Sequence, residues 1–332
     1  MANIAVIGAG TWGMALARML VNSGSEVTVW SAVPEEIDLM KMERRQKNLP
    51  GVALPESISY TKSIEEACRG REMLVFAVPS VFVRSTAKTA APYIEPETVI
   101  VDVAKGIEAG SLKTMTEVIA DEIGGLNPLA ALSGPTHAEE VAADLPTTIV
   151  SASEDESAAR RVQEVFSNSV MRVYTNTDVK GVEICGALKN VIALACGVSA
   201  GLGFGDNTKA ALMTRGLAEL TRLGVKMGCR QETFAGLAGM GDLIVTATSR
   251  HSRNNRCGFL IGQGMKPADA VKEVGMVVEG INAIPAAVEL GRKYGVEMPI
   301  VAAADEVVNR GCDPREAVTK LMNRDYKPET GT

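Results

Sequence analysis

Lys189 occupies a setting in which lysine is rare. It is the one charged side chain between Glu183 and Asp206, in the apolar, glycine-punctuated run ICGALKNVIALACGVSAGLGFG. Burying an ammonium group is costly unless the group is paired or loses its charge. A lysine held in this way can keep or release a proton near neutral pH, which is the chemistry that carbonyl reduction requires. The alternative is a lysine at a helix end, with its stem packed inward and its ammonium in water.

A glycine-rich turn near the N-terminus is the second chemical signal. Gly8, Gly10 and Gly13 match G-x-G-x-x-G and enclose Thr11 and Trp12. The match follows a β-branched run and opens an amphipathic helical pattern, which is the context that gives it meaning. Such glycines permit a tight turn, and the helix N-terminus then faces a pyrophosphate. The pattern predicts a dinucleotide site, with an unliganded βα turn as the alternative.

The end of the second predicted strand bears on the choice of dinucleotide. Glu26–Trp30 is followed by Ser31, where an NAD-binding domain usually has Asp or Glu for the ribose 2′-hydroxyl. A missing carboxylate leaves room for a 2′-phosphate and favours NADP, with Arg44, Arg45 and Lys47 as candidate helpers. NAD remains open, because no arginine follows the strand immediately.

Polar residues also follow two later strands of the first half. Lys105 comes after one strand, and Gly134, Thr136 and His137 come after the next. The carboxyl ends of parallel strands border the ligand crevice of a doubly wound sheet. Lys105 is therefore a candidate contact for a substrate anion or cofactor, with a solvated loop lysine as the alternative. A lone loop histidine such as His137 is more often incidental.

A basic cluster lies in the second half of the chain. Arg250, Arg253 and Arg256 surround Ser252, a good helix N-cap, and Asn254 follows. Arginine beside a helix N-terminus binds phosphate well, although three arginines are often only a solvated face. Asp242, in Gly239–Asp242, is a candidate to orient or charge-pair with Lys189.

The elements that position these residues change in kind along the chain. Short β-branched runs alternate with helical patterns in the first half, which predicts a Rossmann-type, parallel doubly wound α/β domain. Helical periodicity alone continues afterwards and predicts an all-α domain. We expect domains at 1–180 and 181–326 and a flexible tail at 327–332. The expected strands are Ile4–Ile7, Glu26–Trp30, Ile58–Thr61, Met73–Val78, Val99–Val103, Leu129–Ser133, Thr147–Ser151 and Met171–Tyr174; the later helices are Val182–Cys196, Thr208–Met227, Ser252–Gly262, Lys266–Val274, Ile281–Tyr294, Pro299–Asn309 and Pro314–Asn323.

Composition limits the classes of function. The 332 residues are 46% hydrophobic and 22% charged, with a formal charge of -6, which is typical of a globular protein and not of a nucleic-acid binder. Six scattered cysteines without CxxC spacing indicate reduced thiols in a cytoplasmic protein. Two histidines exclude a histidine-rich metal centre, and we expect no metal.

Neither apolar stretch is expected to enter a membrane. Ile4–Val21 lacks a basic n-region and is interrupted by glycines, so it does not resemble a signal peptide. The run around Lys189 contains polar residues, and its later part is expected to break at Gly197, Gly201, Gly203 and Gly205. We expect a buried helix that ends in a glycine-rich loop.

Taken together, these motifs resemble the bacterial-type NAD(P)-dependent glycerol-3-phosphate dehydrogenases over nearly the whole chain. The resemblance rests on the following segments, in this order: GAGTWG, LPG–LP at Leu49–Pro55, AVPS at Ala77–Ser80, AKG at Ala104–Gly106, SGPTHAEE from Ser133, GALKNV at Gly186–Val191, GLGFGDN at Gly201–Asn207, TRGLAEL, GMGDLIVT, SRN and VVEG at Val277–Gly280. It departs at Ala32, where the family often has a basic residue.

The resemblance implies interconversion of sn-glycerol 3-phosphate and dihydroxyacetone phosphate, a step that feeds phospholipid synthesis. Lys189 would be the acid–base residue, with Asp242, Lys105 and Asn190 as further catalytic residues. Substrate contacts would come from Lys105, Gly134, Thr136, Lys189, Asp242, Ser252, Arg253 and Asn254. Cofactor contacts would come from Gly8, Gly10, Thr11, Trp12, Gly13, Lys105, Ala138, Arg253, Val277 and Glu279. The apolar helical half also suggests a homodimer.

Two other functions remain open at this point. A β-hydroxy-acid or ketopantoate-type dehydrogenase shares the architecture, but its substrate carries a carboxylate where the Ser252–Asn254 cluster suits a phosphate. A non-catalytic NADP-binding sensor would keep the glycine turn but leave Lys189 without a role.

Overall fold

The computed structural model describes residues 1–249, 251–326, 328 and 329, which form two compact units. The sheet unit contains Met1–Ala187 and Gly228–Val245; the helical unit contains Leu188–Met227 and the described residues from Thr246 onward. Helices α8 (Val179–Gly201) and α11 (Asp242–Thr248) carry residues of both units. The predicted domain limits at residues 180 and 326 stay predictions, and the expected tail at 327–332 lies mostly outside the described residues.

The sheet unit is built on eight strands in the order β3-β2-β1-β4-β5-β6-β7-β8. All eight strands predicted from β-branched runs are present. Their bounds are β1 Asn3–Ile7, β2 Glu26–Trp30, β3 Ser59–Thr61, β4 Met73–Phe76, β5 Val99–Asp102, β6 Leu129–Ser133, β7 Thr147–Ala152 and β8 Met171–Asn176.

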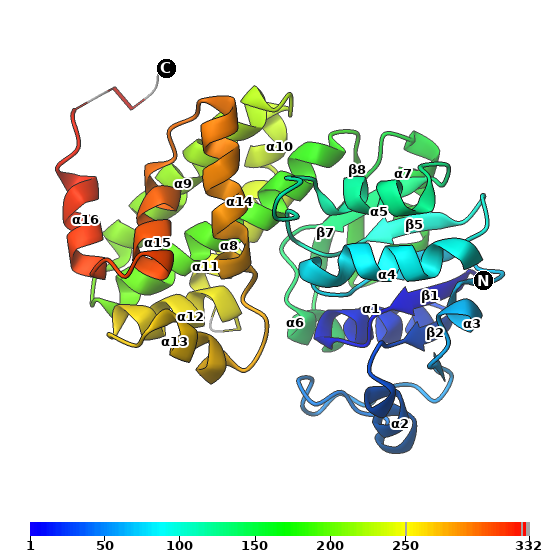
Figure 1. Cartoon of the computed structure of the whole chain (residues 1–332). Helices are drawn as coiled ribbons and strands as arrows, with labels where there is room; N and C mark the ends of the chain where they lie inside the picture. The colour runs from blue at the N-terminus through cyan, green and yellow to red at the C-terminus, as the bar shows by residue number, and fades with distance from the viewer. Residues whose placement is uncertain (250, 327, 330–332) are drawn as a thin grey trace. The chain divides into compact units, whose positions relative to one another are not determined.

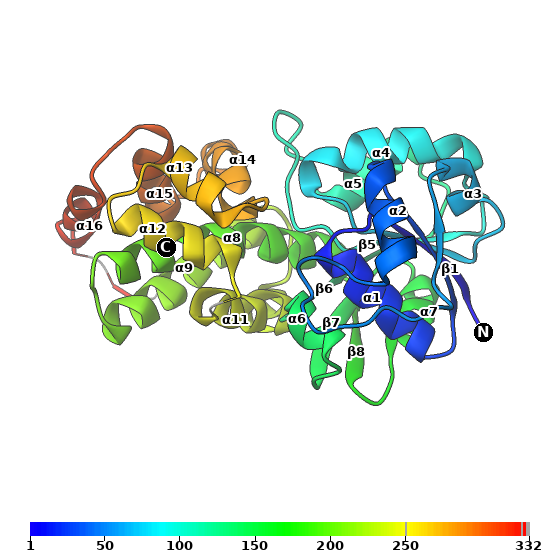
Figure 2. The ribbon, with the colours of Figure 1, turned by 90° about the horizontal axis from the view of Figure 1, so that it is seen from below.

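Alternating side chains of each strand supply two separate apolar cores, one on each face of the sheet. In β1, Ile4 and Val6 pack with helices α1 (Thr11–Asn22), α6 (Ala138–Ala142) and α7 (Glu156–Phe166). Ala5 and Ile7 of the same strand pack with α3 (Ile64–Cys68), α4 (Val83–Ala90) and α5 (Met115–Ile123). Helices therefore cover both faces, as the doubly wound prediction requires (Figures 1 and 2). Helix α2 (Pro34–Glu43) and the 3₁₀ turns η1 (Ser80–Phe82) and η2 (Ala91–Tyr93) complete this part.

The expectation that every strand is parallel is wrong for the last two. β7 pairs antiparallel with β6, and β8 runs parallel to β7. The connection after β6 contains only the five-residue helix α6, about 7.5 Å long at 1.5 Å per residue. A five-residue strand is about 17 Å long, so this helix is too short to carry the chain back along the sheet. The next strand, β7, therefore starts at the edge of the sheet where β6 ends and runs in the opposite direction.

The helical unit confirms the seven helices predicted for the second half. Besides α8, they are α9 Asp206–Lys226, α12 Arg253–Gly262, α13 Pro267–Val274, α14 Glu279–Tyr294, α15 Pro299–Asn309 and α16 Pro314–Met322. The sequence analysis missed α10 (Gln231–Ala235), the π-helical turn η3 (Leu237–Gly241) and α11. Glycines at 236, 239 and 241 interrupt the helical pattern there, which hides these short elements.

The expected break at Gly197 is wrong, whereas the glycine-rich loop expected after the buried helix is present: α8 ends at Gly201, and Gly203 and Gly205 lie before α9. Gly197 and Gly201 both lie within α8, where they contact α12. A Cβ atom on Gly197 would lie 2.1 Å from the carbonyl oxygen of Asn255, and one on Gly201 would lie 2.2 Å from that of Phe259. Glycines of α12 make the reciprocal contact, since a Cβ on Gly258 would lie 2.1 Å from the carbonyl oxygen of Leu194. The glycines let the two helix backbones touch.

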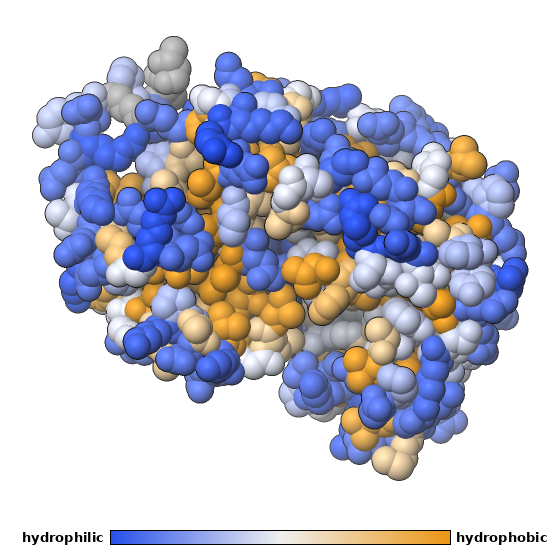
Figure 3. Space-filling view, viewed as in Figure 1, coloured by the Kyte–Doolittle hydropathy of each residue, from blue (hydrophilic) through white to orange (hydrophobic). Residues whose placement is uncertain are grey.

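Helix α8 is long and apolar enough to cross a bilayer, but 78% of its most apolar window is buried within the protein. That burial is typical of a core helix. On the visible face, hydrophilic and apolar residues are mixed over α2, and apolar residues gather on the helical unit around α14 and α8 (Figure 3).

We predict that Gly197→Ala destabilises the protein by about 1–3 kcal/mol, because the new methyl group overpacks the α8–α12 contact. This loss exceeds the gain of about 1 kcal/mol that alanine gives a helix interior. Chemical unfolding followed by circular dichroism measures the difference. Gly205→Ala is the control: Gly205 has φ −87° and nothing within 4 Å of the added atom, so its stability should stay within about 0.5 kcal/mol. Stabilisation by Gly197→Ala would contradict the packing argument.

Candidate active site

The glycine turn between β1 and α1 has the form of a dinucleotide cradle. Gly8 has φ +126°, and a Cβ there would lie 2.6 Å from the carbonyl oxygen of Ala77. A Cβ on Gly13 would lie 2.1 Å from the carbonyl oxygen of Gly8, so α1 packs directly against the turn. Gly10, by contrast, has nothing within 4 Å and caps α1 without a side-chain hydrogen bond. The turn thus leaves open space at a helix N-terminus, which fits a pyrophosphate.

Thr11, Trp12 and Ala138 border this cradle in sequence and structure. Thr11 opens α1, and its Oγ1 accepts a hydrogen bond from Nδ2 of Asn48 at 3.2 Å. Trp12 and Ala138 are partly buried and pack against the same apolar core. These residues fit the predicted cofactor contacts of the sheet unit.

Lys105 forms a largely buried ion pair in the sheet unit. Its Nζ donates to Oδ2 of Asp242 at 2.6 Å and to the carbonyl oxygen of Gly134 at 3.1 Å. The Asp242 side chain is only 2% exposed, so this charge pair is largely shielded from water. Thr136 Oγ1 donates to the same Gly134 carbonyl at 3.1 Å. The structure therefore brings together four predicted substrate contacts: Lys105, Gly134, Thr136 and Asp242.

Asp242 pairs with Lys105, a partner that the sequence analysis did not suggest, and its suggested pairing with Lys189 stays a prediction. Asp242 is the first residue of α11, and the sequence analysis did not find this helix. His137 contacts the same helix, α11: its Nε2 lies 3.4 Å from the carbonyl oxygen of Val245.

Two buried carboxyl groups, those of Asp102 at the end of β5 and of Glu183 on α8, influence each other. Burial and the neighbouring Glu183 raise the pKa of Asp102 well above its ordinary range. Burial also raises the pKa of Glu183, although Thr116 donates to both of its oxygens, from N at 2.8 Å and from Oγ1 at 2.5 Å. Ionising a buried carboxyl group is costly, so burial favours the protonated form of both side chains.

Lys189 is the buried cation of the helical unit. It lies in the middle of α8 and is 4% exposed, which excludes the alternative of a lysine at a helix end. Its Nζ donates to Oγ1 of Thr246, a residue that is itself 5% exposed. Sequence reasoning did not identify Thr246 as a site residue. It lies four residues after Asp242, one helical turn along α11, and this spacing could have indicated it.

A network of hydrogen-bonded amide groups starts at Asn190, the residue that follows Lys189 in α8. Asn190 Oδ1 accepts from Nδ2 of Asn254 at 2.9 Å, and Oδ1 of Asn254 accepts from the backbone N–H of Gly280 at 2.8 Å. A Cβ on Gly280 would lie 2.6 Å from the Asn190 carbonyl oxygen, so α14 starts in direct contact with α8. The network joins α8, α12 and the start of α14.

The N-terminus of α12 has the features expected of an anion site. Ser252 caps it, accepting from the Asn255 N–H at 3.2 Å, and no acidic residue lies in its first turn. Arg253 is exposed, and its Nη1 donates to the carbonyl oxygen of Val277 at 3.2 Å. This contact ties Arg253 to the residues just before Glu279, the first residue of α14. Arg250, predicted to belong to this cluster, lies outside the described residues.

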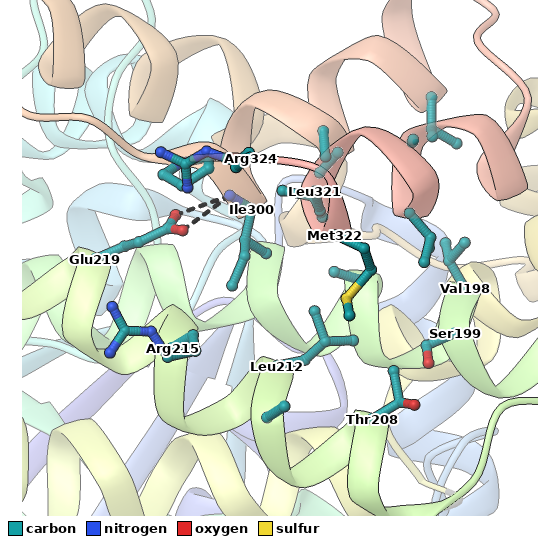
Figure 4. Close-up of a pocket in the computed structure, with 18 of the residues that line it drawn as sticks. Val198, Ser199, Thr208, Leu212, Arg215, Glu219, Ile300, Leu321, Met322 and Arg324 are labelled. Carbon is teal, nitrogen blue, oxygen red and sulfur yellow. Dashed lines mark hydrogen bonds between the residues drawn. The ribbon is translucent and has the colours of Figure 1, made fainter. Parts of the chain in front are cut away.

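A large cavity in the helical unit contains none of the predicted site residues. It has a volume of about 590 Å³ between α8, α9, α15 and α16. Val198, Leu212 and Leu321 line it, and Glu219 lies in its wall, accepting from the Ile300 N–H at 2.9 Å (Figure 4). Among the described residues, no three His, Cys, Asp or Glu side chains are placed to hold a metal ion.

A doubly wound sheet with a glycine turn, together with a helical unit that buries a lysine, defines a nucleotide-dependent dehydrogenase. Comparison with known proteins narrows this class. Residues 3–159 and 178–319 match the N- and C-terminal models of NAD-dependent glycerol-3-phosphate dehydrogenase. The chain therefore belongs to the NAD-dependent glycerol-3-phosphate dehydrogenase family.

Individual relatives agree with this family. The chain is 65% identical to a glycerol-3-phosphate dehydrogenase (NAD(P)+) of Lactobacillus delbrueckii subsp. bulgaricus, over 99% of both chains. It is 50% identical to one of Agathobacter rectalis, covering 99% of this chain and 98% of the relative. The crystal structure of glycerol-3-phosphate dehydrogenase from Coxiella burnetii matches with a TM-score of 0.94 and 37% identity, over 97% of this chain and 99% of that one.

The buried Glu219 generates a pH-dependent prediction. Burial raises its pKa from 4.5 to about 7, against the lowering effect of the Ile300 and Val301 N–H groups. The folded protein thus keeps a proton that the unfolded chain loses, so this residue reduces stability as pH rises from about 4.5 to 7. We expect Glu219→Gln to gain stability relative to wild type across this range, by up to about 3 kcal/mol. Urea unfolding at pH 5 and pH 8 measures it; a difference independent of pH would contradict the prediction.

Proposed function

We propose that this protein is an oxidoreductase that interconverts sn-glycerol 3-phosphate and dihydroxyacetone phosphate with NAD or NADP, supplying glycerol 3-phosphate for phospholipid synthesis. Family membership and the names of its relatives support the reaction. The observation in the structure that carries the proposal is Lys189, a fully buried ammonium donor held by Thr246. The nicotinamide cofactor, when bound, supplies or accepts the hydride.

Lys189 is proposed as the acid–base residue. In the direction of reduction its ammonium group donates a proton to the oxygen forming at C2 of the substrate; in oxidation its amine takes that proton back. Thr246 Oγ1 accepts from Nζ and so restricts where the ammonium group lies. Burial of this donor excludes water from competing for the proton.

Substrate binding is proposed for the first turn of α12 and for the Lys105 cluster. Ser252, Arg253 and Asn254 would hold the phosphate group, because a helix N-terminus and a guanidinium group both attract an anion. Lys105 and Asn190 would polarise the C2 oxygen, with Gly134, Thr136 and Asp242 fixing the position of Lys105 and of the substrate. Such positioning lowers the barrier because the reacting groups are oriented before reaction.

Cofactor-binding residues are proposed for each unit by itself. In the sheet unit these are Gly8, Gly10, Thr11, Trp12, Gly13, Lys105 and Ala138. In the helical unit they are Arg253, Val277 and Glu279, of which the first two are joined by a hydrogen bond.

Assembly and location are further parts of the proposal. A homodimer is supported by the apolar residues gathered on the helical unit around α14 and α8 (Figure 3). A cytoplasmic location is supported by six cysteines that are all free, five of them buried.

The direct test is oxidation of NADH and of NADPH that depends on dihydroxyacetone phosphate. Turnover with this substrate, and none with phosphate-free hydroxyacetone or a β-keto acid, is the expected result. Turnover of a keto acid alone would favour the β-hydroxy-acid or ketopantoate-type alternative. Light scattering of the purified protein tests the dimer in the same preparation.

We predict that Lys189→Met lowers kcat by about 10²–10⁴-fold, because the proton donor is lost while the methionine fills a similar volume. Steady-state kinetics with dihydroxyacetone phosphate provide the measurement, with circular dichroism to verify the fold. Lys180→Met is the matched control, since Lys180 lies on the same helix but its side chain is 41% exposed and paired with Glu117 at 3.0 Å. Near wild-type kcat in Lys189→Met would rule out the acid–base role.

A second substitution tests the phosphate site. Arg253→Ala should raise the KM for dihydroxyacetone phosphate by about 10–100-fold, because a hydrogen bond to a charged group is lost. The control is Arg256→Ala, one turn along α12, where the side chain is 56% exposed and lies 3.9 Å from Glu273. That variant should keep its KM within about twofold. An unchanged KM in Arg253→Ala would remove this residue from the phosphate site.

A further inference from the structure

The end of β2 lies beside the glycine turn, because the Gly8 N–H donates to the carbonyl oxygen of Trp30 at 2.9 Å. In a dinucleotide-binding sheet the adenosine ribose reaches this strand end, where an acidic side chain accepts a hydrogen bond from the 2′-hydroxyl. Here the next residue is Ser31, which is only 6% exposed. Its uncharged hydroxyl by itself selects neither NAD nor NADP.

A carboxylate nevertheless reaches this position from the first turn of α2. Ser31 Oγ donates to Oε2 of Glu36 at 2.8 Å, and the same Oγ accepts from the Val33 N–H at 3.1 Å. The Glu36 N–H donates to the Val33 carbonyl oxygen at 3.1 Å, which closes the turn between strand and helix. Glu36 is half-buried and is fixed against the strand end by these contacts.

Four of the five charged residues of α2 are acidic. Glu35 lies in the same helical turn as Glu36, and Asp38 follows in α2. Lys62, after β3, is already paired with Asp38, with Nζ 2.7 Å from Oδ2. Arg44, a candidate helper for a 2′-phosphate, instead donates to the Ile58 carbonyl oxygen at 3.1 Å and lies over the Tyr60 ring at 5.3 Å.

We propose that Glu36 replaces the usual strand-end carboxylate and makes the enzyme select NAD(H) over NADP(H). Its free carboxylate oxygen would accept from the ribose 2′-hydroxyl, while its charge repels a 2′-phosphate. Ser31 is a positioning residue that holds Glu36 in place. The inference rests on the proposed function for the identity of the cofactor, and it departs from the preference for NADP expected from residue types alone.

The test compares kcat/KM for NADH and NADPH, with dihydroxyacetone phosphate saturating. Wild type should favour NADH by about tenfold or more, since like charges close together disfavour the phosphorylated cofactor. Glu36→Gln should reduce this ratio by about tenfold, through a lower KM for NADPH and a higher KM for NADH, with kcat unchanged. Glu35→Gln removes the same charge one residue away and should leave the ratio within about twofold.

Ser31 gives an independent readout. Ser31→Ala should reduce the NADH preference in the same direction as Glu36→Gln, and Ser31→Thr, which keeps the hydroxyl, should restore it. A wild-type enzyme that prefers NADPH would overturn the inference. So would a ratio that Glu36→Gln leaves unchanged, or one that Glu35→Gln shifts equally.

Binding without turnover separates this inference from the proposed reaction. The chain has two tryptophans, Trp12 and Trp30, and both flank the glycine turn. Their fluorescence should be quenched by ADP-ribose at lower concentration than by 2′-phospho-ADP-ribose. Glu36→Gln should reduce the difference between these two concentrations. If this holds without turnover of dihydroxyacetone phosphate, the reaction is wrong and the inference stands. If turnover occurs but the two probes bind alike, the inference alone is wrong.

Discussion

The direct backbone contact between α8 and α12 is the constraint on which the helical unit depends. Gly197 and Gly201 on one helix meet Gly258 and Gly262 on the other, and no side chain larger than hydrogen fits between them. A hydrogen bond of 2.9 Å joins Asn254 on α12 to Asn190 on α8, and this length allows little variation in helix spacing. Helix separation therefore determines whether the polar network forms, and with it where the first turn of α12 stands in relation to Lys189.

Helix α11 shows how a short, irregular element can position two ionic groups. It begins after a π-helical turn, and its residues Asp242 and Thr246, one helical turn apart, hold Lys105 and Lys189 respectively. Each lysine is thereby given an oxygen partner in a setting where an unpaired ammonium would be strongly disfavoured. Removing either oxygen would weaken the compensation of a buried or partly buried charge, which is destabilising.

Much of the fold could be predicted from residue patterns, because strand and helix periodicities are local properties of the chain. The eight strands and seven of the helices from α8 onward were found in this way, and GAGTWG was correctly placed at a strand–helix junction. The direction of β7 and the continuity of α8 through Gly197 were not. Both depend on contacts between segments distant in sequence: a connection too short to cross the sheet, and a neighbouring helix. The ion pair of Asp242 with Lys105 also joins residues 137 positions apart and was not predicted. Glu36 was missed for a different reason: it lies five residues after Ser31, and the turn between β2 and α2, not a strand position, brings its carboxylate there.

The polar residues of α8 explain how so apolar a helix can specify one arrangement. Glu183 accepts from Thr116, Lys189 donates to Thr246, and Asn190 accepts from Asn254, so each of these three polar groups has a partner on a different element. Hydrophobic burial alone is non-directional and would tolerate a helix rotated or shifted by a residue. Either movement would strand several buried polar groups at once, each at a cost of about 1–3 kcal/mol. The apolar surface of α8 thus drives its burial, whereas its few polar side chains set its register, and Lys189 is one of the residues that this register positions.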